Sequence, residues 1–406
     1  MKIGVWLGDY KSPEEGGGYS YIDRLVKGID DYHFSSELDI CFINEGNFIK
    51  GFKKEVITLQ YNEKQRITFK EKIKCRIPIG IIKNGCKSMI QMRYQEEKLK
   101  SYKNQLKKKG VKIIYYIHQW DCNIPDFPSI MTNWDIGHLS TYSFPEFFMT
   151  YSFSSRNRIY KDLYPKALFI FTESEAGKKE LIQYTGINPQ HIKVVPIFAG
   201  ECVKHVMDSD KENFFLTEKK LEKNKYFFYP AQFWAHKNHI GLIKAFKLFI
   251  DQYPGYKLAL TGSDKGTLSY VKATVSQLGI QDSVLFLGFV STEEMNALYR
   301  NATSLIMASH FGPTNMPPLE ALELSCPIIC SDLAGHREEL EDAALYFNSL
   351  DINELVDAMI EMVENRDKYL QKTKVQAQKT IFKLDNALKA INKNLCEASI
   401  VRDCWE

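Results

Sequence analysis

The sequence predicts an α/β protein built of two similar domains that face each other across a cleft. Apolar, strand-like runs alternate with amphipathic helical patterns along the chain, and a polar stretch at residues 208–224 interrupts the alternation once. Strands that alternate with helices pair in parallel, with helices covering both faces of the sheet. A chain of 406 residues suffices for roughly two to three domains. We therefore expect one domain over residues 1–205 and a second over residues 206–384.

Each domain contributes its own series of expected elements. In the first domain, strands are expected at 3–7, 40–43, 56–59, 111–117, 168–172 and 194–197, and helices at 19–29 and 176–184. In the second domain, strands are expected at 226–229, 258–261, 284–287, 304–307, 328–331 and 345–347. A helical pattern over residues 240–249 stops before Pro254 and Gly255, which break helices. Ser291 and Glu294 have the spacing of a capping box at another helix start.

Composition indicates an ordinary globular protein. The chain is 44% hydrophobic and 25% charged, which is typical of folded domains. No run approaches the ~18 apolar residues that a membrane-spanning helix needs. The first nine residues are too short and too soon interrupted for a signal peptide, so they are interpreted as a first strand. We expect a cytoplasmic protein.

The potential metal ligands form no metal-binding pattern. The nine cysteines are odd in number and scattered, which favours reduced thiols over a disulfide framework. His236 and His239 are three positions apart, but zinc requires more ligands than this pair. Asp208 and Asp210 form an Asp-x-Asp pair of the kind that can hold a divalent ion, yet their polar surroundings are typical of a solvated loop. We expect neither a metal nor another cofactor.

Charge is distributed unevenly along the chain. Between Lys50 and Lys112 the sequence holds 19 Lys and Arg residues against five Glu, an excess of +14, which leaves −11 for the rest. Such asymmetry indicates an anionic partner, either a membrane surface or nucleic acid. Apolar residues from Met89 to Leu106 keep near-helical spacing downstream of the apolar segment 77–82, as in a helix that binds a membrane interface. A solvated helix packed on its own sheet is the alternative.

A strand–loop–helix junction at residues 310–322 is a candidate binding site. Thr314 or Asn315 can cap the helix by accepting a hydrogen bond from a first-turn amide. Pro317 and Pro318 fall where a missing N–H costs nothing. Such a helix start presents free amides and positive dipole charge, which suit a phosphate or sugar oxygens. A plain capped helix is the alternative.

Glu320 in this junction, and three positions after other strands, carry candidate chemistry. Glu320, about one turn into the expected helix, is suited to accept hydrogen bonds from ribose hydroxyls. Lys237 lies between a strand and a helix start, where a cation stabilises the charge that builds on a departing diphosphate. His118 follows a strand and can donate to a sugar oxygen. The glycine triplet 16–18 lets backbone amides approach a ligand closely.

These residues resemble the retaining, GT-B-fold glycosyltransferases of family four. The likeness is strongest over residues 226–331, where three segments follow the order seen in that family. The segments are Tyr229-Pro230-Ala231-Gln232-Phe233-Trp234 with His236-Lys237-Asn238-His239, then Leu287-Gly288-Phe289, then Gly312-Pro313-Thr314-Asn315-Met316-Pro317-Pro318-Leu319-Glu320-Ala321. The combination looks most like bacterial enzymes that build surface polysaccharides such as O-antigens. It implies two Rossmann-like domains and a final helix, about residues 385–400, that crosses back to the first domain.

The resemblance also implies a donor site for a nucleoside diphosphate sugar, GDP- or UDP-linked, that needs no metal. Lys237 would contact the diphosphate, Glu320 the ribose and His118 the transferred sugar, and these three would be the catalytic residues. The other donor-binding residues that it implies are Gly17, Gly18, Gln232, Gly262, Phe289, Thr314, Asn315, Met316, Pro317 and Leu319.

Two positions depart from the pattern of the family. Gln232 stands where a basic residue is usual, and Gly312 stands eight residues before Glu320, where the family has the first Glu of its Glu-x7-Glu pair. The second cation on the diphosphate and the first carboxylate are therefore missing from the places where the resemblance would put them.

Taken together, the sequence predicts transfer of a hexose, with mannose as the leading candidate, to a glycan acceptor hydroxyl with retained configuration. No carboxylate is obviously placed as a nucleophile, so a front-face reaction is expected, in which the departing phosphate takes the proton of the acceptor. The acceptor would be lipid-linked, at the inner face of the cell membrane. A sugar-nucleotide epimerase is one alternative, and non-enzymatic binding of an anionic membrane or nucleic acid is another. Nucleic-acid readers interleave aromatic residues for stacking, and Tyr94 and Tyr102 are few among many lysines, so no nucleic-acid partner is expected.

Overall fold

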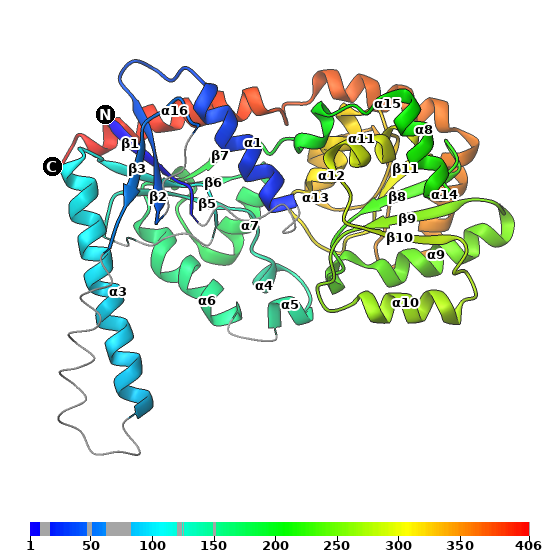
Figure 1. The fold of residues 1–406 in the computed structure, drawn as a ribbon, viewed down its shortest axis with the longest axis horizontal. Coiled ribbons are helices and arrows are strands. Elements are labelled where there is room, and N and C mark those ends of the chain that lie inside the picture. Colours follow the sequence, from blue (N-terminus) through cyan, green and yellow to red (C-terminus); the bar gives the residue numbers. More distant parts are fainter. Residues whose placement is uncertain are drawn as a thin grey trace.

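The computed structural model describes residues 1–8, 17–46, 51–61, 83–119, 124, 126–148 and 152–405, which form two α/β domains (Figure 1). The N-terminal sheet has the strand order β3-β2-β1-β4-β5-β6-β7, and all its pairings are parallel. Its strands are β1 (Lys2–Trp6), β2 (Asp39–Glu45), β3 (Val56–Leu59), β4 (Ile113–Tyr116), β5 (Ser129–Asn133), β6 (Phe169–Thr172) and β7 (Ile192–Val194). Its α-helices are α1 (Gly17–Asp31), α3 (Lys83–Lys108), α4 (Gly137–Ser140), α5 (Pro145–Phe148), α6 (Ser152–Arg158) and α7 (Glu175–Thr185).

The C-terminal sheet has the order β10-β9-β8-β11-β12-β13 and is also parallel throughout. Its strands are β8 (Tyr226–Pro230), β9 (Lys257–Thr261), β10 (Val284–Gly288), β11 (Ser304–Met307), β12 (Ile328–Ser331) and β13 (Ala344–Phe347). Its helices are α8 (Ser209–Glu218), α9 (His239–Gln252), α10 (Leu268–Gln277), α11 (Thr292–Asn301), α12 (Met316–Glu323), α13 (Ala334–Leu340), α14 (Ile352–Glu364) and α15 (Arg366–Lys379). The last helix of the chain is α16 (Leu384–Arg402).

Both faces of the N-terminal sheet are buried. On β4, Ile113 and Tyr115 join one hydrophobic cluster, whereas Ile114 and Tyr116 join the other. Successive side chains of a strand point to opposite faces, so continuous apolar runs of this kind require cover on both sides. The fold class predicted from the sequence, two parallel α/β domains, is confirmed.

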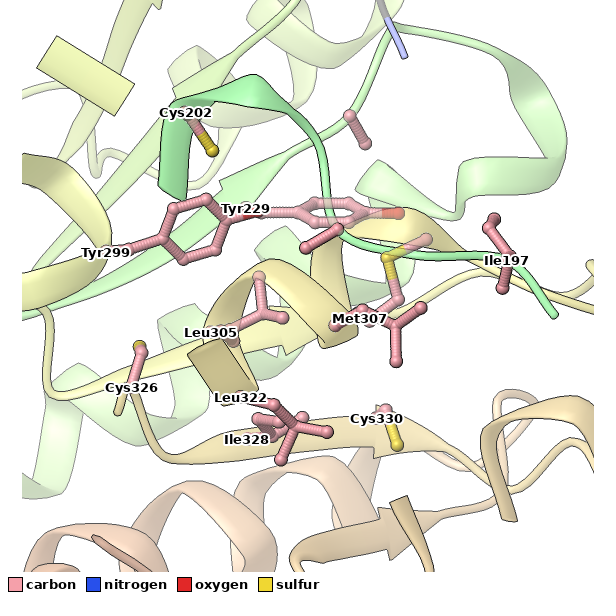
Figure 2. Packing of buried hydrophobic residues seen from close by; sticks show 14 of the residues in the cluster. Ile197, Cys202, Tyr229, Tyr299, Leu305, Met307, Leu322, Cys326, Ile328 and Cys330 are labelled. Atoms are coloured by element: carbon pink, nitrogen blue, oxygen red, sulfur yellow. The ribbon is translucent and has the colours of Figure 1, made fainter. Parts of the chain in front are cut away.

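The core of the C-terminal domain extends into the segment that connects the two domains. Figure 2 shows Tyr229, Tyr299 and Leu305 packed together with Cys202, which belongs to that connecting segment. Tyr229 and Tyr299 are fully buried. The Tyr229 hydroxyl group donates to the Lys237 carbonyl, and the Tyr299 hydroxyl group donates to the Glu320 carboxyl group. The connection between the domains is therefore packed into this core.

Helix α16 leaves the C-terminal domain and packs along α1 of the N-terminal domain, so that the two chain ends lie near each other in Figure 1. Asn392 accepts a hydrogen bond from the Ser35 amide at 2.9 Å, and Lys193 forms an ion pair with Glu397 at 2.5 Å. The helix thus connects the domains a second time.

The local structure differs from the sequence prediction at two places. Strand β5 was not predicted, because its sequence Ser129–Asn133 mixes polar residues into what is a fully buried strand. Asp208 and Asp210 do not form a free loop: the Asp208 side chain accepts from the Asp210 amide at 3.0 Å and caps helix α8. The capping box of Ser291 and Glu294 at the start of α11 is confirmed.

Helix α3 projects from the N-terminal domain in Figure 1 and carries part of the basic region. Near its C-terminal end, Tyr102 and Leu106 are buried against the sheet, so this end packs on its own domain. The apolar segment 77–82, the side chains of residues 83–93 and Gly16 lie outside the residues whose placement is described. Within the described part of the chain, no helix is long and apolar enough to cross a membrane.

Candidate functional site

A cleft of about 1020 Å³ lies between the two domains, at the carboxyl ends of strands from both sheets. Ligands of open parallel α/β sheets bind at this edge. The N-terminal wall of the cleft includes Gly18, Tyr21, Trp134, Asp135, Glu146, Arg156 and Glu173. The C-terminal wall includes Gln232, Lys237, Gly262, Phe289, Asn315, Met316 and Glu320.

Lys237 is held in place by a chain of polar contacts. Its Nζ donates to Asn315 Oδ1 at 2.9 Å, and Asn315 Nδ2 lies 2.9 Å from His336 Nε2. His336 Nδ1 lies 2.7 Å from the carbonyl oxygen of Ser331, which only accepts, so Nδ1 carries the proton and Nε2 accepts from Asn315. Burial lowers the pKa of Lys237 to about 8. The cleft therefore presents an ammonium group whose orientation is fixed before any ligand arrives.

The turn that carries Lys237 follows from its sequence. A 3-10 turn at Ala235–Lys237 comes after β8, and the hydroxyl group of the buried Tyr229 donates to the Lys237 carbonyl at 2.6 Å. Asn238 then adopts a left-handed conformation, with φ at 54°, and its side chain accepts from the Gly241 amide at 3.1 Å to cap α9. Asparagine tolerates this conformation better than most residues do.

The start of helix α12 differs from the prediction. Neither Thr314 nor Asn315 caps the helix: the Asn315 side chain binds Lys237 and His336, and the carboxylate of Glu339 accepts from the Asn315 amide at 3.1 Å. Met316 is the first residue of the helix, and the next two residues are prolines without an N–H. The Met316 amide is therefore the single first-turn donor left for a ligand, not the set of free amides that was expected.

Leu319 does not contribute to the cleft in the way that was predicted. Its side chain is 1% exposed and belongs to the hydrophobic core. Its amide falls at the position where helix geometry pairs an N–H with the carbonyl of the N-cap residue, Asn315. By contrast, Met316 and Pro317 do line the cleft.

Glu320 lines the cleft and is 6% exposed. Its Oε2 accepts from the Tyr299 hydroxyl group at 2.6 Å. A Cβ atom at Gly200, in the interdomain segment, would lie 2.4 Å from Glu320 Oε1, so a larger residue there would require the Glu320 side chain to shift. Burial raises the pKa of Glu320, and its hydrogen-bond donors oppose that rise only in part. Besides facing the cleft, this carboxyl group packs against the connection between the domains.

Glu173 comes from the opposite wall and was not identified from the sequence. It follows β6, is 8% exposed, and accepts from Thr314 Oγ1 at 2.7 Å. Thr314 thus binds a residue of the other domain. Burial raises the pKa of Glu173 to about 8, and the bond from Thr314 opposes that rise. A carboxyl group of this kind is uncharged at neutral pH.

His118 packs against Trp134. The two rings make an edge contact with centroids 4.8 Å apart. Trp134 lines the cleft, whereas His118 is absent from the lining that the described residues form. Next to Trp134, Asp135 forms an ion pair with Arg156 at 2.9 Å, which adds one cation to this wall.

The domains are joined across the cleft by directed hydrogen bonds. The Glu146 carboxylate lies 2.5 Å from His236 Nδ1 and also accepts from the His236 amide at 2.9 Å. These bonds outweigh the effect of burial, which raises the pKa of Glu146, and the net pKa is lowered. In addition, the two carboxylate oxygens of Glu338 accept from the amides of Glu175 and Ala176 at 2.8 and 2.7 Å, at the N-terminus of α7. A carboxylate at a helix N-terminus is stabilised by the helix dipole.

Four of the remaining predicted residues, Gly18, Gln232, Gly262 and Phe289, line the cleft. Gly17 begins α1 and Gly18 faces the cleft beside Trp134. Gln232 accepts from Trp234 Nε1 at 3.0 Å. Gly262 has φ at 137°, and a Cβ atom there would lie 2.4 Å from the Ala231 carbonyl oxygen. The ring of Phe289, 70% exposed, follows β10. Among the residues described, no group of three or more His, Cys, Asp and Glu side chains could hold a metal ion.

Two α/β domains with a shared cleft define the fold as GT-B, and solved structures of that fold superpose on nearly the whole chain. Sucrose-phosphate synthase from Thermosynechococcus elongatus matches with a TM-score of 0.69 at 14% identity, over 99% of each chain. Anabaena HepE, solved with UDP and glucose, matches with a TM-score of 0.67 at 18% identity, over 98% of this chain and 100% of HepE.

The sequence of the C-terminal domain gives a narrower match. Residues 210–380 match the sequence model of the family described as glycosyl transferases group 1. The O-antigen chain mannosyltransferase RfbU of Salmonella typhimurium is 32% identical over 149 residues, 37% of this chain and 41% of RfbU. The aligned segment thus spans less than half of that relative. The comparisons thus show the GT-B fold for the whole chain and the sequence pattern of glycosyl transferases group 1 for residues 210–380.

Proposed function

We propose that this protein is a retaining hexosyltransferase that uses a nucleoside diphosphate sugar to extend a bacterial surface polysaccharide. The observation that carries the proposal is the fixed ammonium group of Lys237, directed at Asn315 beside the start of α12 in a cleft between two GT-B domains. A departing diphosphate accumulates negative charge, and a cation positioned in advance stabilises it most effectively.

The described residues suggest how the donor lies in the cleft. The diphosphate would contact Lys237 and the Met316 amide, and the ribose would lie at Glu320. The nucleobase would occupy the ends of β9 and β10, where Gly262 lines the cleft and the exposed ring of Phe289 offers a stacking surface. This arrangement leaves the transferred sugar between Lys237 and the N-terminal wall.

The reaction we propose is a front-face substitution. The bond between the anomeric carbon and the leaving phosphate oxygen breaks, the acceptor oxygen bonds to the same face, and its proton passes to the departing phosphate. Protein residues position the two substrates and stabilise the leaving group. The bonds that join the domains, such as Glu146 with His236, support a closed cleft that excludes water and limits hydrolysis of the donor.

The names of similar proteins support the choice of substrates. RfbU is named an O-antigen chain mannosyltransferase, and HepE was solved with UDP and glucose. We propose mannose as the transferred sugar and either GDP or UDP as its carrier, with no metal. We further propose a lipid-linked glycan acceptor at the inner face of the membrane, because α3, whose sequence is rich in lysine, projects from the N-terminal domain (Figure 1).

Thermal unfolding in the presence of GDP-, UDP-, dTDP- and CMP-sugars tests the donor site. A ligand that binds only the folded state raises the midpoint of unfolding as its concentration rises. We expect one nucleotide family to raise the midpoint for the wild type and for Lys247→Ala, a partly exposed lysine on α9 paired with Asp251, but not for Lys237→Ala. A rise that survives in Lys237→Ala, or no rise with any donor, would contradict the proposal.

Product analysis with the donor so identified separates the enzyme classes. We expect the sugar to appear on an added glycan acceptor, with the α- or β-configuration of the donor retained. Release of an altered free sugar without any acceptor would instead identify an epimerase.

A further inference from the structure

We infer that Glu173, on the N-terminal wall, binds a hydroxyl group of the transferred sugar and so contributes to the choice of sugar. The inference rests on the proposed function and assigns to that site a residue that neither the sequence motifs nor the comparisons supply.

Hydrogen bonds of Glu173 and of the next residue, Ser174, hold the backbone at this position. The Glu173 carbonyl oxygen accepts from the Ile197 amide at 3.1 Å. The next residue, Ser174, caps α7 by accepting from the Gly177 amide at 2.9 Å, and its hydroxyl group donates to the Pro313 carbonyl at 3.2 Å. The Glu173 side chain therefore starts from a rigid strand end that is tied to the loop of the opposite wall.

Glu173 and Lys237 meet the same short segment of that loop. Thr314 binds Glu173 at 2.7 Å, and Asn315, the next residue, binds Lys237 at 2.9 Å. A sugar attached to a diphosphate at Lys237 consequently lies within reach of the Glu173 carboxyl group. Thr314 occupies Oε2, and among the described residues Oε1 has no hydrogen-bond partner.

The chemistry of Glu173 suits a sugar hydroxyl group better than a cation. Within the described part of the chain it forms no ion pair, and the nearby charge that acts on it is the carboxylate of Asp135. With Oε2 accepting from Thr314, the uncharged carboxyl group presents Oε1 either as an O–H donor or as a carbonyl acceptor, and a sugar hydroxyl group can pair with either form. A diphosphate bound beside it would favour the uncharged form further.

The opposite wall cannot supply this contact at Gly312. Gly312 has φ at 142°, and a Cβ atom there would lie 2.4 Å from Asn315 Nδ2, the group that orients the amide toward Lys237. A side chain at position 312 would thus disturb the Lys237 site. Glycine therefore suits position 312, and the Glu173 carboxyl group reaches the sugar from the other domain.

Calorimetric titration with the nucleoside diphosphate, the complete nucleoside diphosphate sugar and its monodeoxy sugar analogues tests the inference. We expect Glu173→Ala to bind the nucleoside diphosphate as the wild type does, but the sugar nucleotide about tenfold more weakly. One deoxy analogue should lose affinity for the wild type and lose none for Glu173→Ala, which identifies the hydroxyl group by a double-mutant cycle. Glu173→Gln, which keeps size and an uncharged amide, should recover part of the affinity.

Glu180→Gln is the matched control, because Glu180 is a second carboxyl group whose pKa burial raises, to about 7, and it lies on α7 outside the lining of the cleft. It should bind all ligands as the wild type does. If Glu173→Ala weakens the nucleoside diphosphate and the sugar nucleotide equally, or weakens neither, the inference is wrong. If the wild type binds no nucleoside diphosphate at all, the proposed function itself fails, which is a different result.

Discussion

The two walls of the cleft differ in charge and in how their side chains are held. The C-terminal wall presents Lys237, fixed by Asn315, together with the start of α12. The N-terminal wall presents carboxyl groups, of which Glu146 and Glu173 already bind the other domain, and its cation Arg156 is paired with Asp135. The C-terminal wall thus presents an oriented cation, whereas Glu146 and Glu173 of the N-terminal wall join the two domains.

The largest effect should come from removing the cation of the C-terminal wall. We expect Lys237→Ala to lower the rate of sugar transfer about 10²- to 10³-fold, the range found when one donor to a developing charge is lost. Initial rates with saturating acceptor give this number, and Lys247→Ala is the control. An unchanged rate in Lys237→Ala would mean that the anion binds elsewhere.

A smaller effect, on stability, should come from adding a methyl group to the same wall at Gly262. Gly262 and Gly266 both have positive φ, at 137° and 109°, but a Cβ atom would meet the Ala231 backbone only at Gly262. Gly262→Ala should therefore cost about 1–3 kcal/mol more of the free energy of unfolding than Gly266→Ala. Chemical denaturation of the two variants measures the difference. Equal costs would show that the backbone yields at this position.

The pH dependence of binding sharpens the comparison further. In the protein without a ligand, burial lowers the pKa of Lys237 to about 8. The ammonium group therefore loses its proton as the pH rises above 8. Affinity for the nucleoside diphosphate should fall by up to about tenfold per pH unit between pH 8 and 9. It should fall less in Lys237→Arg, since arginine stays charged. Both titrations should be made with proteins that also carry Glu173→Gln. The pKa of Glu173 is also about 8, so this carboxyl group would otherwise lose its proton in the same pH range. The same fall with arginine would contradict the assignment.

The smallest effect should come from loosening the contact between the walls. Glu338→Ala removes the carboxylate that accepts from the amides of Glu175 and Ala176, and we expect a loss of about 1 kcal/mol in the free energy of unfolding. Hydrogen exchange in the first turn of α7 should become faster, whereas Asp342→Ala, at an exposed site, should leave it unchanged. Unchanged exchange in Glu338→Ala would show that the cap does not hold the domains together.

The sequence predicted many of the residues that line the C-terminal wall of the cleft and few of those that line the N-terminal wall. Lys237, Asn315 and Glu320 lie in one domain at the ends of strands with clear apolar patterns, so local rules place them at the same edge. Glu146 and Glu173 acquire partners 90 and 141 residues away, in the other domain, and no local pattern predicts such packing. The role of Asn315 as a support for Lys237, rather than a cap, also depends on a distant contact with His336.

A structure of the protein with an intact nucleoside diphosphate sugar, or a non-hydrolysable analogue, tests the central claim most directly. The division between the walls predicts that a phosphate oxygen lies within hydrogen-bond distance of Lys237 Nζ and that a sugar hydroxyl group lies within the same distance of the Glu173 carboxyl group. A diphosphate bound away from Lys237, or a sugar directed away from the N-terminal wall, would contradict it.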